Sequence, residues 1–369
     1  MSFSRLRPLV LLLALALAAP ARAETLREAA GARLLVGCAV NTADLRDPKL
    51  AGLVAAQFNC LTPEYEMMPE KLMEETGRFH FEQADEIVSF AQAHGMPVCG
   101  HMLMWHFVSR RALFEGPDGT PLPRDRALAN LERYIREVMG HFKGRVKAWN
   151  VVNEALSDRD GEYLRDTPAR RAIGDDYVEK AFAFAHAADP TADLYYNDYN
   201  VEQPAKLART LRLVRELQSK GVPLAAVGIQ GHWLLDWPPP DLIGRGIDAL
   251  AATGVKVMIT ELDVDPLPRR GSGADMAVTE QGANPYPDGL PPDVQARLAR
   301  RYAEIVSTVV RRPAVTTLGF WGTHDGRSWL NDFPVKGRTN HPLLFDRNLQ
   351  PKPAFDAVLK ALQEGAAAR

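Results

Sequence analysis

Two glutamates follow apolar stretches of this sequence and supply the residue types that glycosidic bond cleavage requires. Glu154 comes directly after residues 147–153, and Glu261 comes just after residues 255–259. Each stretch is short and apolar without a helical period, which is typical of a buried strand. Glycoside hydrolysis uses one protonated carboxyl to protonate the leaving oxygen and one ionised carboxylate to attack the sugar or activate water. The two glutamates therefore predict a glycosidase site.

Further polar and aromatic residues stand where other predicted strands end. Amide and imidazole groups can hydrogen-bond sugar hydroxyls, and indole rings can cover the apolar faces of sugar rings. Because catalytic groups gather at the carboxyl ends of the strands in a (β/α)8 barrel, we expect these side chains to share one rim. The expected rim residues are Glu64, His101, Trp105, Asn153, Asn197, Gln230, His232, Asp263, Trp321 and Trp329, together with Glu154 and Glu261.

Short strand-like stretches alternate with amphipathic helical stretches along the whole chain. Uniform alternation predicts a parallel sheet, and eight strand–helix units predict a closed (β/α)8 TIM barrel, here as one catalytic domain over residues 24–369. A doubly wound open sheet is the alternative, but no glycine-rich phosphate-binding turn follows the first strand. The predicted strands are 34–40, 58–61, 97–105, 147–153, 192–197, 226–230, 255–259 and 317–321, and the predicted helices are 48–57, 82–94, 126–142, 177–188, 204–220, 241–252, 293–311 and 353–363.

The first 23 residues have the pattern of a secretory signal peptide. Arg5 and Arg7 form a positive region, residues 8–19 are apolar, and Ala-Arg-Ala at 21–23 is a small-x-small cleavage pattern. The apolar run is shorter than about 18 residues, which disfavours a transmembrane anchor. We therefore expect cleavage near Ala23 and a secreted or periplasmic protein.

Charge and cysteine content limit the expected partners. A formal net charge of −2 gives no electrostatic basis for binding nucleic acid or an anionic membrane, and we expect a monomer. A Cys38–Cys60 bridge is conceivable, but we interpret these two cysteines and Cys99 as buried free thiols. The long connection 266–292, rich in proline and glycine, is expected to form a wall of the binding cleft.

Several motifs make the chain resemble glycoside hydrolase family 10, the retaining endo-β-1,4-xylanases. The central ones are Trp-Asn-Val-Val-Asn-Glu-Ala at 149–155 and Ile-Thr-Glu-Leu-Asp-Val at 259–264. Further matches are Gly-His-Met-Leu-Met-Trp-His at 100–106, Tyr-Asn-Asp-Tyr-Asn at 196–200, Gly-Ile-Gln-Gly-His at 228–232, and Phe-Trp-Gly at 320–322 followed by Asp325, Ser328 and Trp329. The resemblance covers nearly the whole chain after the predicted signal peptide.

The resemblance implies a role for each matching position. Glu154 corresponds to the general acid/base, Glu261 to the nucleophile, and Asn153 to the residue that binds the sugar 2-hydroxyl. His232 and Asp263 correspond to the pair that orients and ionises the nucleophile. No metal or organic cofactor is implied. The sugar-binding positions just upstream of the cleaved bond are Glu64, His101, Trp105, Gln230, Trp321 and Trp329, and Tyr199 lies where the family stacks the first sugar downstream.

The chain departs from this family pattern at the upstream end of the cleft. Tyr65 stands where the family usually has asparagine, Met68 stands where it usually has lysine, and His324 replaces a small residue. A phenol and a thioether offer fewer hydrogen-bond donors than an amide and an ammonium group. Two substrate expectations therefore stay open: xylan or xylo-oligosaccharides, or a short, capped or unusual β-glycoside cleaved by the same chemistry.

Two other classes of protein are disfavoured by the same residues. A non-catalytic sugar-binding barrel has no need of both Glu154 and Glu261. A metal-dependent hydrolase is disfavoured because no His-x-His motif occurs on an early strand. We also interpret Trp149 as a residue that fills the barrel, because it precedes the strand end by several positions.

Overall fold

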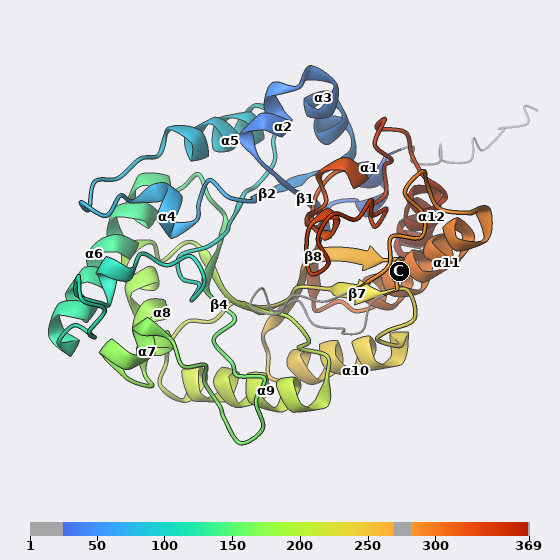
Figure 1. Cartoon of the computed structure of the whole chain (residues 1–369). Coiled ribbons are helices and arrows are strands. Elements are labelled where there is room, and N and C mark those ends of the chain that lie inside the picture. Colours follow the sequence, from blue (N-terminus) through green and yellow to red (C-terminus); the bar gives the residue numbers. More distant parts are fainter. Residues whose placement is uncertain (1–24, 269–281, 368–369) are drawn as a thin grey trace, which may run out of the picture.

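The computed structural model describes residues 25–268 and 282–367, and it has the predicted (β/α)8 TIM-barrel architecture. Parallel strands form a central ring, and helices surround it on the outside (Figure 1). The strands are β1 (Leu35–Val40), β2 (Cys60–Pro63), β3 (Cys99–Gly100), β4 (Ala148–Asn153), β5 (Asp193–Asp198), β6 (Ala226–Ile229), β7 (His232–Leu234), β8 (Lys256–Asp265) and β9 (Val315–Phe320).

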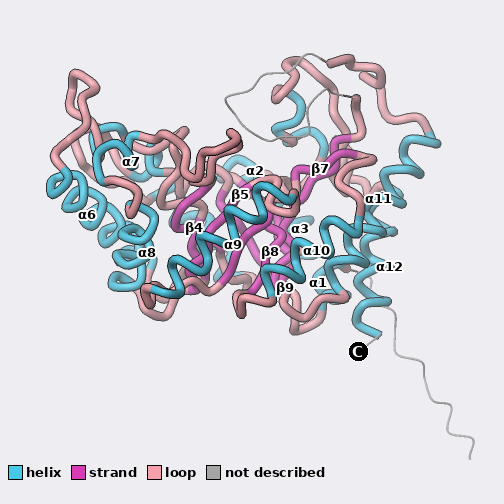
Figure 2. Tube along the Cα trace, turned by 90° about the horizontal axis from the view of Figure 1, so that it is seen from below, coloured by secondary structure: helices cyan, strands magenta, loops and turns pink. Residues whose placement is uncertain are grey.

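Parallel pairing runs around the ring in the order β2-β1-β9-β8-β6-β5-β4-β3. The first and last strands of this order meet where the Leu61 backbone N–H donates to the Pro97 carbonyl at 3.1 Å, which nearly closes the barrel. Because all strands run in one direction, the loops that leave their carboxyl ends share one side of the molecule. That side is the upper one in Figure 2, opposite the C-terminus.

The eight predicted helices are all present, with ends that differ from the predicted ends by four residues or fewer. Short additional helices precede the barrel or lie in its loops. The α-helices are α1 (Leu26–Ala30), α2 (Thr42–Arg46), α3 (Pro48–Gln57), α4 (Pro69–Leu72), α5 (Glu82–Ala93), α6 (Arg124–Phe142), α7 (Pro168–Ile173), α8 (Tyr177–Ala188), α9 (Pro204–Ser219), α10 (Pro240–Ala251), α11 (Pro292–Val310) and α12 (Pro353–Ala367), and the 3-10 helices are η1 (Arg111–Leu113), η2 (Asp325–Arg327) and η3 (Trp329–Asn331).

One predicted strand is much shorter than predicted, and one strand was missed. The predicted strand 97–105 is reduced to the two residues of β3, because the following backbone bonds to β4 only at separate points, such as the Leu103 N–H to the Asn150 carbonyl at 2.9 Å. The strand β7 was not predicted. It begins at His232 and pairs with the carboxyl end of β8, so that His232 lies beside Asp263 in register.

Most of the core lies between the barrel strands and the surrounding helices. Trp149 belongs to this layer: it is buried, and its ring centre lies 6.0 Å from that of Phe142 on α6. Trp149 therefore fills the core, as interpreted, and it does so on the side of the strand that faces α6. The Trp149 ring also explains Gly100 on the neighbouring strand, because a Cβ there would lie 2.4 Å from the ring.

The three cysteines are free and buried, as predicted. The Sγ atoms of Cys60 and Cys99 lie 3.7 Å apart on β2 and β3, whereas Cys38 packs in the main core. The predicted signal peptide lies outside the described residues, as do residues 269–281 of the predicted cleft wall at 266–292. Within residues 25–268 and 282–367, no helix combines the length and apolarity that a bilayer crossing needs.

Candidate active site

Twelve side chains from distant parts of the sequence line one pocket at the carboxyl rim of the barrel. Every one of them belongs to the site expected from the sequence. Of the expected rim and site residues, Asn197, Asp263 and Tyr199 do not line this pocket. The lining residues are Glu64, Tyr65, Met68, His101, Trp105, Asn153, Glu154, Gln230, His232, Glu261, Trp321 and Trp329.

Glu154 is buried just beyond β4, and three neutral N–H groups contact its carboxylate. Oε1 accepts from Gln230 Nε2 at 2.8 Å and from Asn153 Nδ2 at 3.1 Å, and Oε2 accepts from Trp105 Nε1 at 2.8 Å. Glu154 has a φ of 57°, in the left-handed region that residues with a side chain rarely adopt. This turn at the strand end allows the carboxyl to reach the pocket, and such strained positions concentrate at functional sites.

The pKa of Glu154 is raised to about 7. Burial is the main cause, and the negative charge of Asp198 is the second. Hydrogen bonds from Gln230 and Trp105 and the charge of Arg165 partly oppose this rise. Glu154 is therefore suited to hold a proton near neutral pH.

Glu261 lies within β8 and is held by donors of a different kind. Its Oε1 accepts from Asn197 Nδ2 at 2.7 Å, and its Oε2 lies 3.1 Å from His232 Nε2. Burial alone would raise the pKa of Glu261, but the hydrogen bond from His232, the charges of His101 and His232, and the Asn197 amide together lower it. Glu261 is therefore kept ionised.

The imidazole of His232 lies between two carboxylates. Its Nε2 faces Glu261, and its Nδ1 forms an ion pair with Asp263 Oδ2 at 3.1 Å. Burial alone would lower the pKa of His232, but these carboxylates raise it to about 10. Asp263 Oδ2 also accepts from Trp329 Nε1 at 2.7 Å. Asp263 thus lies behind His232 rather than in the pocket, as expected for an orienting residue.

A chain of amides connects the two glutamates beneath the pocket. Asn197 Nδ2 contacts both Glu261 and Asn153 Oδ1, the latter at 2.8 Å, and Asn153 Nδ2 contacts Glu154. Thr260 Oγ1 donates to Asn197 Oδ1 at 2.7 Å. This bond fixes the orientation of the amide, so that Nδ2 points toward Asn153 and Glu261. The sequence placed Asn197 on the rim without a role, and the role of Thr260 was missed. Alternation along β8 gave no signal for Thr260, because it places adjacent residues on opposite faces, whereas the register of β8 against β9 shifts between Ile259 and Leu262.

The upstream end of the pocket is built from the segment after β2. Burial and the charges of Asp44 and Glu66 raise the pKa of Glu64 to about 7, although hydrogen bonds from Tyr65 and Asn41 oppose the rise. The Tyr65 side chain is 43% exposed, so one aromatic surface remains open beside the pocket.

The opposite end of the upstream wall is aromatic. The ring centre of Trp321 lies 5.0 Å from that of His101, and that of Trp329 lies 4.7 Å from that of His232. Both tryptophans are half-buried and present part of their surface to the pocket. Met68 adds a thioether to the same pocket and is itself buried.

Tyr199 does not occupy the position that the sequence suggested. It is 2% exposed, its hydroxyl is hydrogen-bonded to Asp158 and Arg165, and the Lys206 Nζ lies 4.5 Å from its ring centre. The prediction that Tyr199 stacks on the first downstream sugar does not fit this placement, because charged side chains cover the ring.

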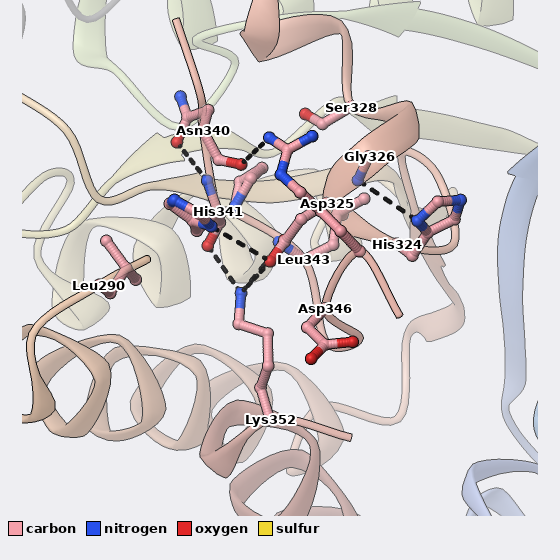
Figure 3. A network of polar contacts seen from close by, with 12 residues as sticks. Leu290, His324, Asp325, Gly326, Ser328, Asn340, His341, Leu343, Asp346 and Lys352 are labelled. Atoms are coloured by element: carbon pink, nitrogen blue, oxygen red, sulfur yellow. Dashed lines mark hydrogen bonds and ion pairs between the residues drawn. The ribbon is translucent and has the colours of Figure 1, made fainter. Parts of the chain in front are cut away.

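A buried network holds the loop that carries Trp329 (Figure 3). The Lys352 Nζ donates to Asp325 Oδ2 at 2.9 Å and to the His341 carbonyl at 2.7 Å, and Asp325 Oδ1 accepts from the Leu343 N–H at 2.9 Å. His324, the third departure from the family pattern, uses its Nδ1 to accept from the Gly326 N–H at 3.3 Å. His324 therefore caps the start of η2 in the loop after β9, and it does not line the pocket.

The neighbouring Asn340 joins this network to the strand that carries Glu261. Its Nδ2 donates to Asp265 Oδ1, the last residue of β8, at 2.9 Å. In the part of the chain that the structure describes, no three His, Cys, Asp or Glu side chains gather as ligands for one metal ion.

Comparison with known proteins places this architecture in one family. The sequence profile of glycosyl hydrolase family 10 matches residues 25–361. The chain is 42% identical over 308 residues to a beta-1,4-xylanase of Dictyoglomus thermophilum, covering 84% of this chain and 83% of that protein. It is 37% identical over 345 residues to endo-1,4-beta-xylanase A of Xylanibacter ruminicola, covering 91% and 93%.

The solved structures agree with the sequence comparison. A GH10 endoxylanase retrieved from a sugarcane soil metagenome superposes with a TM-score of 0.87 at 38% identity, covering 91% of this chain and 99% of that one. Xylanase XynB of Paenibacillus barcinonensis, solved with a conduramine derivative, gives 0.83 at 35% identity, covering 91% and 98%. The chain therefore belongs to glycosyl hydrolase family 10.

Proposed function

We propose that the protein is an endo-β-1,4-xylanase that hydrolyses xylan or xylo-oligosaccharides with retention of anomeric configuration. The observation that carries this proposal is one pocket with two buried glutamates whose pKa values are moved in opposite directions. A carboxyl kept protonated and a carboxylate kept ionised are the two groups that the reaction needs. Relatives named as xylanases support xylan as the substrate class.

In the first step, the ionised Glu261 attacks the anomeric carbon of the sugar upstream of the cleaved bond. Protonated Glu154 donates its proton to the glycosidic oxygen as the carbon–oxygen bond breaks. The products of this step are a glycosyl ester on Glu261 and the released downstream sugar. His232 remains protonated at working pH and stabilises Glu261 as the nucleophile.

In the second step, Glu154 has lost its proton and acts as a base. It takes a proton from water as the water oxygen attacks the anomeric carbon, which releases Glu261 and restores the starting configuration. Asn153 is assigned to the 2-hydroxyl, because its amide lies between the two glutamates. Six further residues are assigned to upstream sugars: Glu64, His101, Trp105, Gln230, Trp321 and Trp329.

Proton NMR of the first-formed product tests this stereochemistry. Hydrolysis of a xylo-oligosaccharide should release the β-anomer first, followed by slow mutarotation. Initial release of the α-anomer would show inversion and would remove Glu261 from the role of nucleophile.

A second substrate class is favoured by the upstream end of the pocket. There, the exposed Tyr65 and the buried Met68 stand in place of polar side chains that would bind the second upstream xylose. We propose that this end selects a short, capped or unusual β-glycoside if it binds xylose poorly. Loss of hydrogen bonds from a charged donor is worth about 1.5–3 kcal/mol each.

Reversal of this departure separates the two substrate classes. The double variant Tyr65→Asn with Met68→Lys should gain about tenfold to a hundredfold in kcat/KM on unbranched xylo-oligosaccharides, because remote binding energy is used in the transition state. No gain, or a loss, would mean that Tyr65 and Met68 are already adapted to xylose. A panel of aryl glycosides would then identify the preferred sugar.

We also propose that the enzyme is exported, with cleavage near Ala23. The charged, apolar and small-residue segments of the first 23 residues support this proposal. N-terminal sequencing of the protein recovered from the periplasm or medium should begin at residue 24. A full-length chain retained in the cytoplasm would contradict it.

A further inference from the structure

A buried lysine lies next to the segment that follows Glu154, and the proposed reaction gives it no task. Lys206 on α9 is 3% exposed. Its Nζ lies 2.8 Å from Asp158 Oδ1, 3.1 Å from Asp198 Oδ1 and 3.1 Å from the Leu156 carbonyl oxygen. An ammonium group has three N–H donors, so these three acceptors use all of them. Because Lys206 is enclosed, it can influence substrate only through its neighbours.

Lys206 contacts the backbone carbonyl of Leu156, and Tyr196 on β5 contacts the backbone N–H of the same leucine. Leu156 donates its backbone N–H to the Tyr196 hydroxyl oxygen at 3.1 Å. The Tyr196 hydroxyl in turn donates to Asp198 Oδ2 at 2.5 Å, while Lys206 contacts Asp198 Oδ1. Asp198 and Tyr196 are both fully buried. The backbone N–H and C=O of Leu156 are therefore fixed by two side chains that share one carboxylate.

Leu156 stands two residues after the left-handed turn at Glu154. A residue at a φ of 57° stays there only if the flanking backbone is held on both sides. Before the turn, the Glu154 N–H donates to the Asn197 carbonyl at 2.9 Å within the sheet. After it, Ala155 accepts from the Arg165 N–H at 2.8 Å, and Leu156 is held as described.

We propose that Lys206 and Tyr196 are positioning residues for Glu154. By holding Leu156 at both backbone groups, they fix where the turn ends and hence where the Glu154 carboxyl meets the leaving oxygen. This inference rests on the proposed acid/base role of Glu154. Misplacement by about 1 Å can cost a hundredfold in rate, so a change behind the turn is expected to reach the chemistry.

A purely structural role for the cluster makes a different prediction. If Lys206 and Tyr196 only stabilise the fold, their loss reduces the amount of active enzyme equally for every substrate. If they position the acid, the loss is large where the leaving group needs a proton and small where it does not. The ratio of the two losses separates these roles.

The primary test is Tyr196→Phe, which deletes one oxygen and keeps the ring. We expect kcat/KM on xylotetraose to fall about tenfold or more, whereas kcat/KM on 2,4-dinitrophenyl xylobioside should fall less than about threefold. Tyr134→Phe is the matched control, because Tyr134 on α6 is also buried and its hydroxyl has no hydrogen-bond partner among the described residues. Its kinetics should equal those of the parent on both substrates.

A second pair of variants tests the lysine itself. Lys206→Met should show the same preference for the activated substrate. Lys352→Met breaks the other buried lysine–aspartate pair, beside Trp329, and any loss there should be equal on both substrates. Circular dichroism and thermal unfolding of each variant define the folded fraction to which the rates refer.

Glu154→Ala is assayed in parallel to separate the acid role of Glu154 from the positioning role of Lys206 and Tyr196. If Glu154→Ala spares the activated substrate but Tyr196→Phe loses activity equally on both, the positioning role is overturned and the proposed function stands. If Glu154→Ala itself loses equally on both, the acid role fails and the positioning role fails with it. Selective loss in both variants supports the inference.

Discussion

The surroundings of Glu154 and of Glu261 differ in one physical respect that separates their chemistry. The two residues are 3% and 4% exposed, so burial raises both pKa values and cannot distinguish them. Neutral donors contact Glu154, and the charge that most affects its pKa is the carboxylate of Asp198, which raises it. Glu261 instead faces the cationic His232. Opposite protonation states therefore follow from one charged neighbour on each side.

The comparison also identifies the origin of the raised pKa of Glu154. A neighbouring carboxylate raises the pKa of a carboxyl, but Glu261 is not among the main causes for Glu154. Burial and Asp198 raise it more. Glu154 thus remains a suitable acid even while the ionised Glu261 is paired with the cationic His232. The following predictions test this division between the two sides.

The largest effects are expected from removing each glutamate. Glu261→Ala removes the nucleophile and should abolish turnover of activated and unactivated substrates alike. Glu154→Ala should lower kcat/KM by about 10²–10⁴ on xylo-oligosaccharides and far less on dinitrophenyl glycosides, which need no proton. Steady-state kinetics on both substrate types measures the difference. An identical pattern for the two variants would contradict the separate roles of Glu154 as acid and Glu261 as nucleophile.

The next effect concerns the cation on the Glu261 side. His232→Asn keeps a hydrogen-bond donor but removes the charge, so the pKa of Glu261 should rise. The acid limb of kcat/KM should then move to higher pH, and below the limb each unit of movement lowers kcat/KM about tenfold. An acid limb that stays in place would show that hydrogen bonds, rather than the charge, keep Glu261 ionised.

A smaller effect is expected from pH on the parent enzyme. The active form carries a proton on Glu154, whose pKa is about 7. Activity on xylo-oligosaccharides should therefore fall as pH rises through about 7. Glu64 also has a pKa of about 7, so Glu64→Gln serves as the control and should retain this alkaline limb. If Glu64→Gln loses the alkaline limb, the limb reports the titration of Glu64 and not that of Glu154.

The smallest effect should come from Trp329→Phe. This change keeps an aromatic face but removes the N–H that contacts Asp263 at 2.7 Å. Asp263 would still pair with His232, so kcat/KM should fall about tenfold, the lower end of what the loss of a hydrogen bond to a charged group costs, roughly 1.5–3 kcal/mol. A loss as large as that of His232→Asn would mean that Asp263 cannot orient the His232 imidazole without the hydrogen bond from Trp329.

Much of the barrel and of the pocket could be predicted from the sequence because both depend on local patterns. Alternating apolar periods identify strands and helices, and parallel strands bring their carboxyl ends to one rim. Glu154 and Gln230, far apart in sequence, meet for this reason. Helix starts were predicted closely where proline begins the helix, as at Pro204 and Pro353.

The features that were missed depend on contacts between distant segments. The length of β3 depends on how its backbone meets β4, which no local pattern records. Tyr199 carries a sugar-binding motif, yet its ring is covered by charges from Arg165 and Lys206, which lie on a loop and a helix elsewhere. The effect of Asp198 on Glu154 likewise arises only when neighbouring strands are placed side by side.

Covalent trapping of the intermediate tests the central claim most directly. An activated 2-deoxy-2-fluoro xylobioside slows the second step, so the enzyme should accumulate one glycosyl group per chain. Mass spectrometry of peptic fragments should place that group on Glu261. Attachment to Glu154, or time-dependent inactivation without any covalent adduct, would contradict the assignment of Glu261 as the ionised nucleophile.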